Sequence, residues 1–369
     1  MKSPMRIAQI VGKMNGGGVE SVVMNYYRHI NKSRFQFDFI VDSDSTMVPK
    51  DEIEQLGGRV IEIPPYQKAV DYHKTLVSVL KENNYKIVHS HINTLSVFSL
   101  FAALRAGVPV RIAHNHSTAG KGETVKNLMK YTLRPFSKVF ATHYCACSEY
   151  AGRWLFGSGT MNSGRVKVIR NAIDLKRFLY NSQVRAEVRE ELGLTNEMVV
   201  GHVGRFMHQK NHKFLVEVFA ELLKQEPKAV LLLIGEGELQ ESMVKYVNEL
   251  GIADNVKFLG QRADVHRLYQ TMDLFLFPSH YEGLGMVCIE AQASGLPCLV
   301  SDAVPDEAKV MENMEFLSLN DTAEVWSDEL IKLVHNTKRE NTFKQMQEAK
   351  FEITTAAEDM QDYYEDLVK

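Results

Sequence analysis

The sequence predicts an α/β protein of two similar domains, each built on a parallel β-sheet that is covered by helices. Three observations support this fold class. The chain has 369 residues, which is enough for two domains of ordinary size. Short apolar runs alternate with longer amphipathic segments, which is typical of parallel strands joined by helices. Several of these runs end in glycine or histidine, at the sheet edge that binds ligands in open parallel sheets.

The apolar runs place strands in both halves of the chain. We predict strands at residues 6–11, 35–41, 59–63, 86–91, 110–116 and 167–171 in the first half, and at 199–204, 229–235, 256–260, 274–278 and 298–301 in the second. The series pauses at residues 171–174, and we place the domain boundary there. The first domain then begins at residue 1 and ends at 172, and the second contains residues 173–352.

Composition excludes several classes of protein. Hydrophobic residues make up 45% of the chain and charged residues 24%, as in globular proteins, and the net charge of −3 gives no indication of a nucleic acid partner. No apolar run reaches 18 residues, so we predict no transmembrane helix and expect a cytoplasmic protein. The four cysteines, at positions 145, 147, 288 and 298, form neither a disulfide framework nor a metal motif.

The most informative stretch is residues 278–297, which we predict to contain a glycine-bearing turn and a helix between two strands. Gly283 and Gly285 stand at the start of the helix, where bare backbone amides and the helix dipole favour an anion. Glu282 precedes this helix start and Glu290 lies inside the helix. Two carboxylates beside an anion site fit a ligand with phosphates and hydroxyls, such as a nucleotide sugar. The alternative fits equally well: Glu282 would be an ordinary acid at the first turn of the helix, and Glu290 an ordinary solvated acid on its surface.

A glycine cluster, residues 16–18, follows the first predicted strand and precedes an amphipathic helix. Gly17 and Gly18 would allow a phosphate or a sugar to approach the backbone closely. The cluster is neither G-x-G-x-x-G nor a P-loop, which argues against a nicotinamide dehydrogenase. A simple tight turn is the alternative.

Four histidines lie at or near the ends of two predicted strands. The pairs His89/His91 and His114/His116 each have a spacing of two, which places both members on the same strand face. Together they could bind a metal ion, but no carboxylate cluster or H-E-x-x-H motif accompanies them, and we predict no metal. We expect one neutral imidazole to donate to a substrate hydroxyl or carbonyl and the others to serve packing or hydrogen bonding.

A basic stripe recurs at nearly every fourth position of a predicted helix. It could be a solvated surface, or it could bind anionic lipid headgroups. Its members are Lys121, Lys126, Lys130, Arg134 and Lys138.

The second domain opens with a strand that ends at Gly204, followed by Arg205 and Lys210. A planar guanidinium and a compact ammonium at the carboxyl end of a first strand could together neutralise a diphosphate. An ordinary surface basic pair is the alternative. Gly235 and Gly260 stand at the ends of the next two strands and extend the same edge.

These residues resemble the retaining glycosyltransferases of family four, which have the GT-B fold. The resemblance spans nearly the whole chain. It rests on G-G-G-V-E at 16–20, V-I-R-N-A-I-D at 168–174, V-G-R-F-x-x-Q-K-N at 203–211, F-L-G at 258–260, D-L-F-L-F-P-S at 273–279 and E-G-L-G-M-V-C-I-E-A at 282–291. Ala172 replaces the usual glycine and Leu284 the usual phenylalanine. The segment R-I-A-H-N-H at 111–116 resembles sequences of bacterial enzymes that assemble capsule, exopolysaccharide or cell-wall polymers.

The resemblance implies two Rossmann-like domains, with the nucleotide sugar on the second and the acceptor on the first. Residues 353–369 would form a helix that returns to the first domain. The resemblance implies no metal or other cofactor, a UDP-sugar donor and a glycan or lipid-linked acceptor. If the basic stripe binds anionic lipid, we expect peripheral contact with the inner face of the plasma membrane.

The resemblance also assigns roles to single residues. Arg205 and Lys210 would hold the diphosphate and stabilise it as it departs. Glu282 would bind the donor sugar beside the backbone of residues 283–285, and Glu290 the ribose. His116, or else His114, would face the sugar and the acceptor.

Two other functions fit the same fold. A sugar-nucleotide epimerase would need catalytic acids poised at the sugar and no acceptor. A non-catalytic partner subunit of a glycosyltransferase complex would not need to keep Gly204, Arg205, Lys210, Glu282 and Glu290 together. The complete set therefore favours a transferase.

Overall fold

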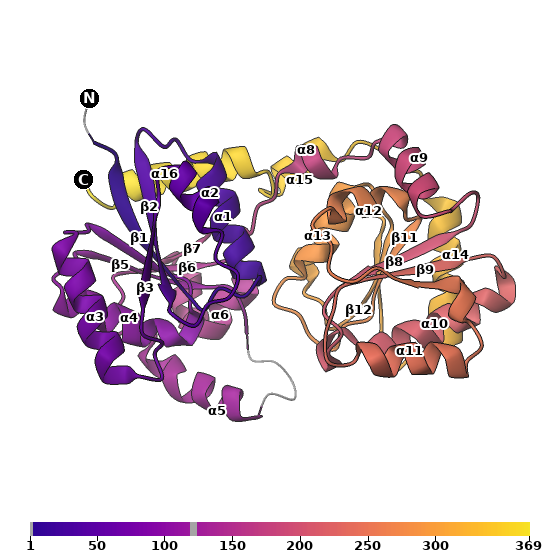
Figure 1. Cartoon of the computed structure of the whole chain (residues 1–369), viewed down its shortest axis with the longest axis horizontal. Helices are drawn as coiled ribbons and strands as arrows, with labels where there is room; N and C mark the ends of the chain where they lie inside the picture. The colour runs from indigo at the N-terminus through magenta and orange to yellow at the C-terminus, as the bar shows by residue number, and fades with distance from the viewer. Residues whose placement is uncertain (1–2, 119–123) are drawn as a thin grey trace. The chain divides into compact units, whose positions relative to one another are not determined.

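The computed structural model describes residues 3–118 and 124–369, and the side chains of these residues except 124–126. Contacts divide the chain into two compact units, Met1–Ile173 with Lys350–Lys369, and Asp174–Ala349. Each unit is a parallel sheet with helices on its faces (Figure 1), so the predicted fold class is confirmed. The first unit is called the N-terminal domain below, and the second the C-terminal domain.

The N-terminal domain contains a seven-stranded sheet in the order β3-β2-β1-β4-β5-β6-β7, and every neighbouring pair is parallel. The first strand lies inside the sheet, between β2 and β4, and the strand order reverses beside it, which is typical of a doubly wound fold. The strands are β1 (Met5–Gly12), β2 (Phe35–Asp42), β3 (Arg59–Ile63), β4 (Ile87–Ser90), β5 (Val110–Asn115), β6 (His143–Ala146) and β7 (Val166–Val168).

Helices cover both faces of this sheet, because alternate strand residues point to opposite sides. Ile7 packs with α1 and α16 on one face, whereas Ala8 packs with α3, α4 and α6 on the other. The helices are α1 (Gly18–His29), α2 (Lys50–Gln55), α3 (Ala69–Glu82), α4 (Ser96–Arg105), α5 (Thr124–Leu133), α6 (Glu149–Phe156), α7 (Ser158–Asn162) and α16 (Ile353–Asp366), with 3₁₀ turns η1 (Asn93–Leu95) and η2 (Arg134–Phe136).

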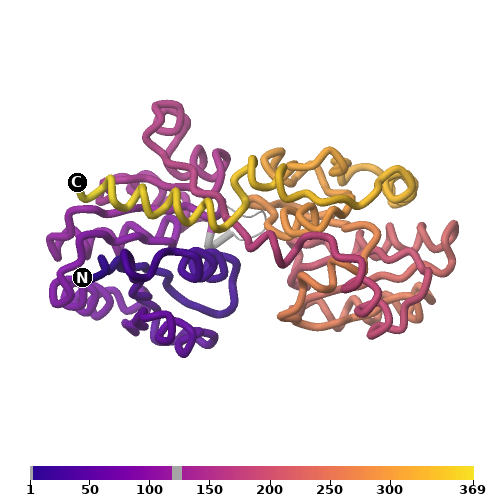
Figure 2. Tube along the Cα trace, turned by 90° about the horizontal axis from the view of Figure 1, so that it is seen from above, coloured from indigo at the N-terminus to yellow at the C-terminus, as the bar shows by residue number. Residues whose placement is uncertain are grey.

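The last helix, α16, belongs to the N-terminal domain although the whole C-terminal domain precedes it in sequence. Figure 2 shows it at the yellow end of the chain, running along the N-terminal domain. Ile353, Ala357, Met360 and Tyr364 are buried on one side of the helix and pack into the core shared with α1. Just before this helix, Glu352 pairs with Ile173 in an isolated parallel β-bridge.

The C-terminal domain contains a six-stranded parallel sheet in the order β10-β9-β8-β11-β12-β13. Its core contains Trp326 of α14 and Phe219 of α10, which lie on the same face of the sheet. The strands are β8 (Val199–Val203), β9 (Val230–Ile234), β10 (Val256–Phe258), β11 (Leu274–Phe277), β12 (Cys298–Ser301) and β13 (Met314–Leu317).

The remaining elements of the C-terminal domain connect or cover these strands. The helices are α8 (Leu175–Phe178), α9 (Ser182–Glu191), α10 (His212–Gln225), α11 (Gln240–Glu249), α12 (Val265–Thr271), α13 (Met286–Ala293), α14 (Ala323–Asn336) and α15 (Phe343–Glu348), and the 3₁₀ turns are η3 (His208–Lys210), η4 (Ala253–Asn255) and η5 (Asp306–Ala308). None of the described helices is long and apolar enough to cross a membrane.

Each strand predicted from the sequence is present, to within a few residues, but two strands were missed. They are β6 and β13, four residues each. The position of α13, from Met286 to Ala293, agrees with the helix predicted within residues 278–297.

Candidate active site

Four loops at the carboxyl ends of β8, β9, β10 and β11 form one edge of the C-terminal domain. Lys210, in η3, lies beside Glu282, and its Nζ is 2.8 Å from Oε1 of the carboxylate. Both side chains are largely buried, with 14% and 8% of their surfaces exposed. The loops are tied by the amide of His280, which donates to the carbonyl of Gln209 at 2.8 Å. The structure therefore brings Lys210 and Glu282 together, 72 residues apart in sequence.

Arg205 lies on the same loop as Lys210 but differs from it in exposure and in its contacts. The residue is exposed, and its guanidinium makes no hydrogen bond or ion pair with any residue that the structure describes. Its neighbour Phe206 is fully buried, and the Phe206 amide donates to the carbonyl of Glu236 at 3.0 Å. The backbone that carries Arg205 is thus fixed, while its charge is available to an anion.

Two of the predicted ligand-binding glycines have a packing role that sequence reasoning missed. A Cβ on Gly235, whose φ is +136°, would lie 2.2 Å from the carbonyl oxygen of Gly204. The amide of Gly235 also donates to the carbonyl of Gly260 at 2.8 Å. Gly235 thus allows the loops after β8 and β9 to approach closely, and its hydrogen bond to Gly260 ties the loop after β10 to them.

Helix α13 and the turn before it carry the remaining predicted residues of this edge, including a second carboxylate, Glu290. Gly285 has a left-handed φ of +79° and caps the helix, and Leu284 beside it is buried. Gly283 lies in the turn between Glu282 and Leu284. Within the helix, Glu290 accepts a hydrogen bond from the hydroxyl of Tyr269 at 3.1 Å.

Glu290 has an unusual proton affinity for a glutamate. Burial raises its pKa to about 7, although the Tyr269 hydrogen bond and the charge of Arg177 act in the opposite direction. Near neutral pH, Glu290 therefore holds a proton more readily than an ordinary glutamate, and a ligand that prefers the carboxylate would change this balance.

The glycine loop of the N-terminal domain has less free backbone than the sequence suggested. The carboxylate of Glu20 accepts the amides of Asn15, Gly16 and Gly17, at 3.0, 2.7 and 2.9 Å. The Gly17 amide is therefore bonded to Glu20, and the close approach of a phosphate or a sugar to Gly17 and Gly18 stays a prediction. Gly18 has open space where a Cβ would lie.

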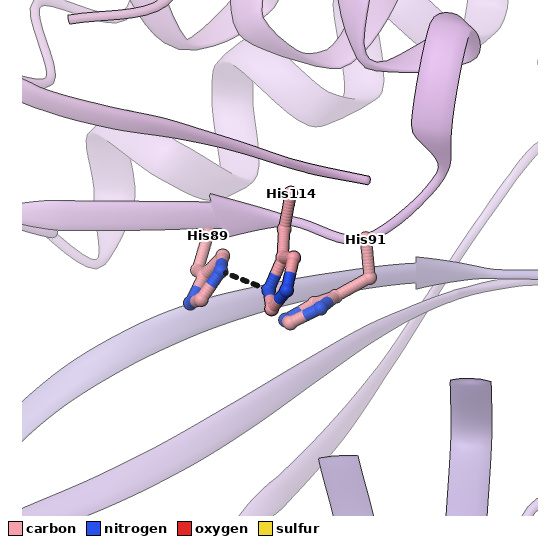
Figure 3. Close-up of side chains that lie close together, drawn as sticks. All are labelled: His89, His91 and His114. Carbon is pink, nitrogen blue, oxygen red and sulfur yellow. Dashed lines mark hydrogen bonds between the residues drawn. The ribbon is translucent and has the colours of Figure 1, made fainter. Parts of the chain in front are cut away.

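The four predicted histidines form one buried cluster at the ends of β4 and β5. The ring centroids of His89 and His91 are 4.2 Å apart, and those of His114 and His116 are 4.0 Å apart, so each pair shares a strand face as predicted. Figure 3 shows the hydrogen bond between His89 and His114. Only 2% of His114 and 7% of His116 is exposed.

Burial keeps these imidazoles neutral. It lowers the pKa of His89 to about 3 and that of His116 to about 4, against a weaker opposing effect of Asn171 on His116. The pKa values of His91 and His114 are also well below the ordinary value, mainly through burial.

The same cluster contains the nitrogen atoms that a metal ion would need. Ring nitrogens of His89, His91 and His114 lie within 4.8 Å of one another. However, both nitrogens of His89 and both of His91 already have hydrogen-bond partners. No carboxylate lines the small cavity beside the cluster among the residues that the structure describes.

The predicted basic stripe is only partly described, because Lys121 and the side chain of Lys126 lie outside the described residues. Lys130 donates to the carbonyl of Thr118 at 3.3 Å, and Lys138 to that of Phe156 at 3.2 Å. The guanidinium of Arg134 lies 5.4 Å from the ring centroid of Trp154. These three cations contact their own domain instead of forming a free stripe.

Apolar side chains are exposed around α5, namely Leu128, Tyr131, Phe136 and Val139. Binding to anionic lipid stays a prediction, and sedimentation with anionic and neutral vesicles tests it. Equal binding to both kinds of vesicle would contradict it.

Comparisons with known protein families match both domains. The family model described as Glycosyltransferase Family 4 matches residues 16–177, and the model described as Glycosyl transferases group 1 matches residues 184–350.

Individual proteins are similar over most of the chain. Glycosyltransferase EpsF of Bacillus subtilis (strain 168) is 36% identical over 333 residues, covering 88% of this chain and 87% of that protein. The UDP-Gal:alpha-D-GlcNAc-diphosphoundecaprenol alpha-1,3-galactosyltransferase of Escherichia coli is 28% identical over 257 residues, covering 67% and 66%. HepE of Anabaena, crystallised in complex with UDP-glucose, has a similar fold, with a TM-score of 0.81, 20% identity, and coverage of 98% and 100%.

Proposed function

Because the chain belongs to the glycosyltransferases of family four and has the GT-B fold, we propose that it moves a hexose or N-acetylhexosamine from a UDP-sugar to a glycan or lipid-linked acceptor. We propose that the reaction retains the anomeric configuration and serves surface polysaccharide assembly. The E. coli relative, which by its name uses UDP-Gal and a diphosphoundecaprenol-linked sugar, supports both substrate classes. The Anabaena complex supports UDP as the nucleotide.

The observation that carries the proposal is the edge formed by Arg205, Lys210 and Glu282. The Arg205 guanidinium, which has no partner among the described residues, and the buried Lys210 ammonium lie on one loop. The guanidinium can bind a diphosphate through two parallel hydrogen bonds, and the ammonium adds a compact positive charge. In the transfer, the bond between the sugar C1 and the phosphate oxygen breaks, and a bond from the acceptor oxygen to C1 forms. The departing diphosphate takes the acceptor proton, and the two cations stabilise its growing charge.

The remaining residues have supporting roles in this proposal. Glu282 binds hydroxyls of the donor sugar beside the backbone of Gly283, Leu284 and Gly285. Glu290 accepts the ribose hydroxyls. On the N-terminal domain, His114 and His116 face the sugar and the acceptor.

We propose further that no metal ion is needed, because the two cations neutralise the charge that Mg²⁺ neutralises in other phosphate-transferring sites. A panel of UDP- and GDP-sugars, scored for thermal shift and for release of the nucleoside diphosphate in excess EDTA, tests the function. Release from a UDP-sugar in the presence of EDTA is expected. Activity that returns only with Mg²⁺, or no response to any nucleotide sugar, would contradict the proposal.

The raised pKa of Glu290 makes nucleotide binding depend on pH. Ribose hydroxyls donate more strongly to a carboxylate than to a neutral acid, so bound UDP favours the ionised form and binding releases a proton. We expect the affinity for UDP to rise by about tenfold or less between pH 6 and pH 8. Calorimetry at several pH values, in buffers of different ionisation enthalpy, measures the affinity and the released proton.

The matched control is Glu290→Gln, which keeps the size of the side chain but cannot ionise. Both proteins share the titration of the UDP phosphate, so the difference between their pH profiles isolates Glu290. Parallel profiles in the two proteins would show that Glu290 does not change its ionisation when UDP binds.

A further inference from the structure

Two residues outside the proposed catalytic set join the four histidines into one network. The side chain of Gln9, on β1, contacts the Tyr364 hydroxyl with Nε2 at 3.2 Å and His91 Nε2 with Oε1 at 2.8 Å. From Tyr364, on α16, the network continues to His89 Nδ1 at 2.7 Å, and from His89 Nε2 to His114 Nδ1 at 3.0 Å.

The second branch of the network starts at Oε1 of the Gln9 amide, which contacts His91. His91 Nδ1 contacts His116 Nε2 at 2.9 Å. Two ring nitrogens end the branches, His114 Nε2 and His116 Nδ1. Both are buried, and neither meets hydrogen-bond geometry with a described residue, although the side chain of Asn171 lies close enough to His116 to raise its pKa.

The hydrogen bonds decide which nitrogen of each neutral ring carries the proton. If Gln9 donates to the Tyr364 oxygen, Tyr364 donates to His89, and His89 Nε2–H donates to His114 Nδ1. The free His114 Nε2 is then a donor.

On the second branch the Gln9 amide accepts a hydrogen bond instead of donating one. The Gln9 oxygen accepts from His91 Nε2–H, so His91 Nδ1 accepts from His116 Nε2–H. The free His116 Nδ1 is then an acceptor.

This result does not depend on which end of the Gln9 amide is the oxygen. With the amide turned over, every hydrogen bond in both branches reverses, and His114 becomes the acceptor while His116 becomes the donor. One amide has one donating and one accepting end, and the single proton of the buried Tyr364 hydroxyl has only Gln9 or His89 as an acceptor among the described residues. The two free nitrogens therefore have opposite senses. The nearby cavity, about 10 Å³ in volume, has room for one water molecule at most.

From this geometry we infer that Gln9 and Tyr364 are positioning residues that fix His114 and His116 as a donor–acceptor pair. The inference deepens the proposed function and rests on it for its catalytic meaning, because those histidines face the sugar and acceptor there. A hydroxyl both donates and accepts, so a pair of fixed and opposite sense orients it. Both ring nitrogens are buried in this structure, so a sugar hydroxyl reaches them only after the side chains that cover them move. No sequence pattern points to this role, since Gln9 and Tyr364 are 355 residues apart.

Nitrogen NMR of the full-length protein labelled in its histidines tests the inference without any substrate. Protonated and bare ring nitrogens have well-separated shifts, and His→Gln variants assign the signals of His114 and His116. In the wild type we expect a single tautomer for each ring and opposite senses at the two free nitrogens. The same sense at both, or averaged shifts in the wild type, would overturn the inference.

Tyr364→Phe removes one hydroxyl and keeps the ring in the core. Without the hydroxyl, the proton between His89 and His114 can lie on either ring, so the His114 shifts become averaged while those of His116 are unchanged. Gln9→Met releases both branches and averages both sets of shifts. The matched control is Tyr363→Phe, because the Tyr363 hydroxyl contacts Cys145 Sγ at 3.6 Å and no histidine of the cluster. A single unchanged His114 tautomer in Tyr364→Phe would overturn the inference.

Kinetics then separate the inference from the proposed function. In Tyr364→Phe we expect kcat for transfer to fall about tenfold, the equivalent of one hydrogen bond, with KM for the UDP-sugar unchanged and Tyr363→Phe at the wild-type rate. If the His114 tautomer changes but kcat does not, the positioning inference holds and the role of these histidines in transfer fails.

Discussion

Arg205→Ala is expected to lower kcat by about 10²–10³ while weakening the binding of the UDP-sugar by less than tenfold. The guanidinium has no partner of its own among the described residues, so all of its hydrogen-bonding capacity is available to the diphosphate. The charge on that diphosphate grows as the bond to the sugar breaks. Arg205 therefore stabilises the transition state more than the bound substrate. Initial rates and calorimetry with the same UDP-sugar measure the two effects separately.

The matched control for this variant is Arg267→Ala. Arg267, on α12, is another partly exposed arginine of the C-terminal domain, but it pairs with Glu191 at 2.8 Å. Its removal should leave both kcat and binding near the wild-type values. Equal losses in the two variants, or a loss of binding without a loss of kcat in Arg205→Ala, would contradict the assigned role.

Lys210→Met is expected to cost both stability and activity, because it leaves the largely buried carboxylate of Glu282 without its counter-charge. Breaking a buried ion pair on one side typically costs about 3–5 kcal/mol. Glu282→Gln leaves the Lys210 ammonium without its counter-charge, but the amide oxygen can still accept its hydrogen bond, so this variant should cost less. Urea unfolding of the full-length variants measures the stability.

The double variant Lys210→Met/Glu282→Gln separates structure from catalysis. With both charges gone, most of the lost stability should return, whereas kcat should stay at least 100-fold below the wild-type value because the diphosphate still lacks its ammonium. Recovery of activity together with stability would show that the pair is structural and that the diphosphate binds elsewhere.

Most of the fold could be predicted from local pattern, because each parallel strand is a short buried apolar run. The two missed strands show the limit of that signal. In β6 the run H-Y-C-A has only four residues. In β13 only Met314 is fully buried. Both strands become visible only when a neighbouring strand pairs with them.

The residue types of the candidate site could be predicted better than their states. Nothing in the sequence shows that Lys210 pairs with Glu282 whereas Arg205 stays free, because the pair spans 72 residues. The occupation of the Gly17 amide by Glu20 follows a local three-residue spacing, and a capping-box search would have found it. The histidine network depends on Gln9 and Tyr364, which no local pattern connects.

The most direct test of the central role of Arg205 and Lys210 is ³¹P NMR of UDP titrated with the wild-type protein in excess EDTA. Both phosphorus resonances should shift on binding without any metal, because the two cations contact the diphosphate itself. Bound UDP whose phosphorus resonances are unchanged, or whose binding appears only when Mg²⁺ is restored, would contradict the account.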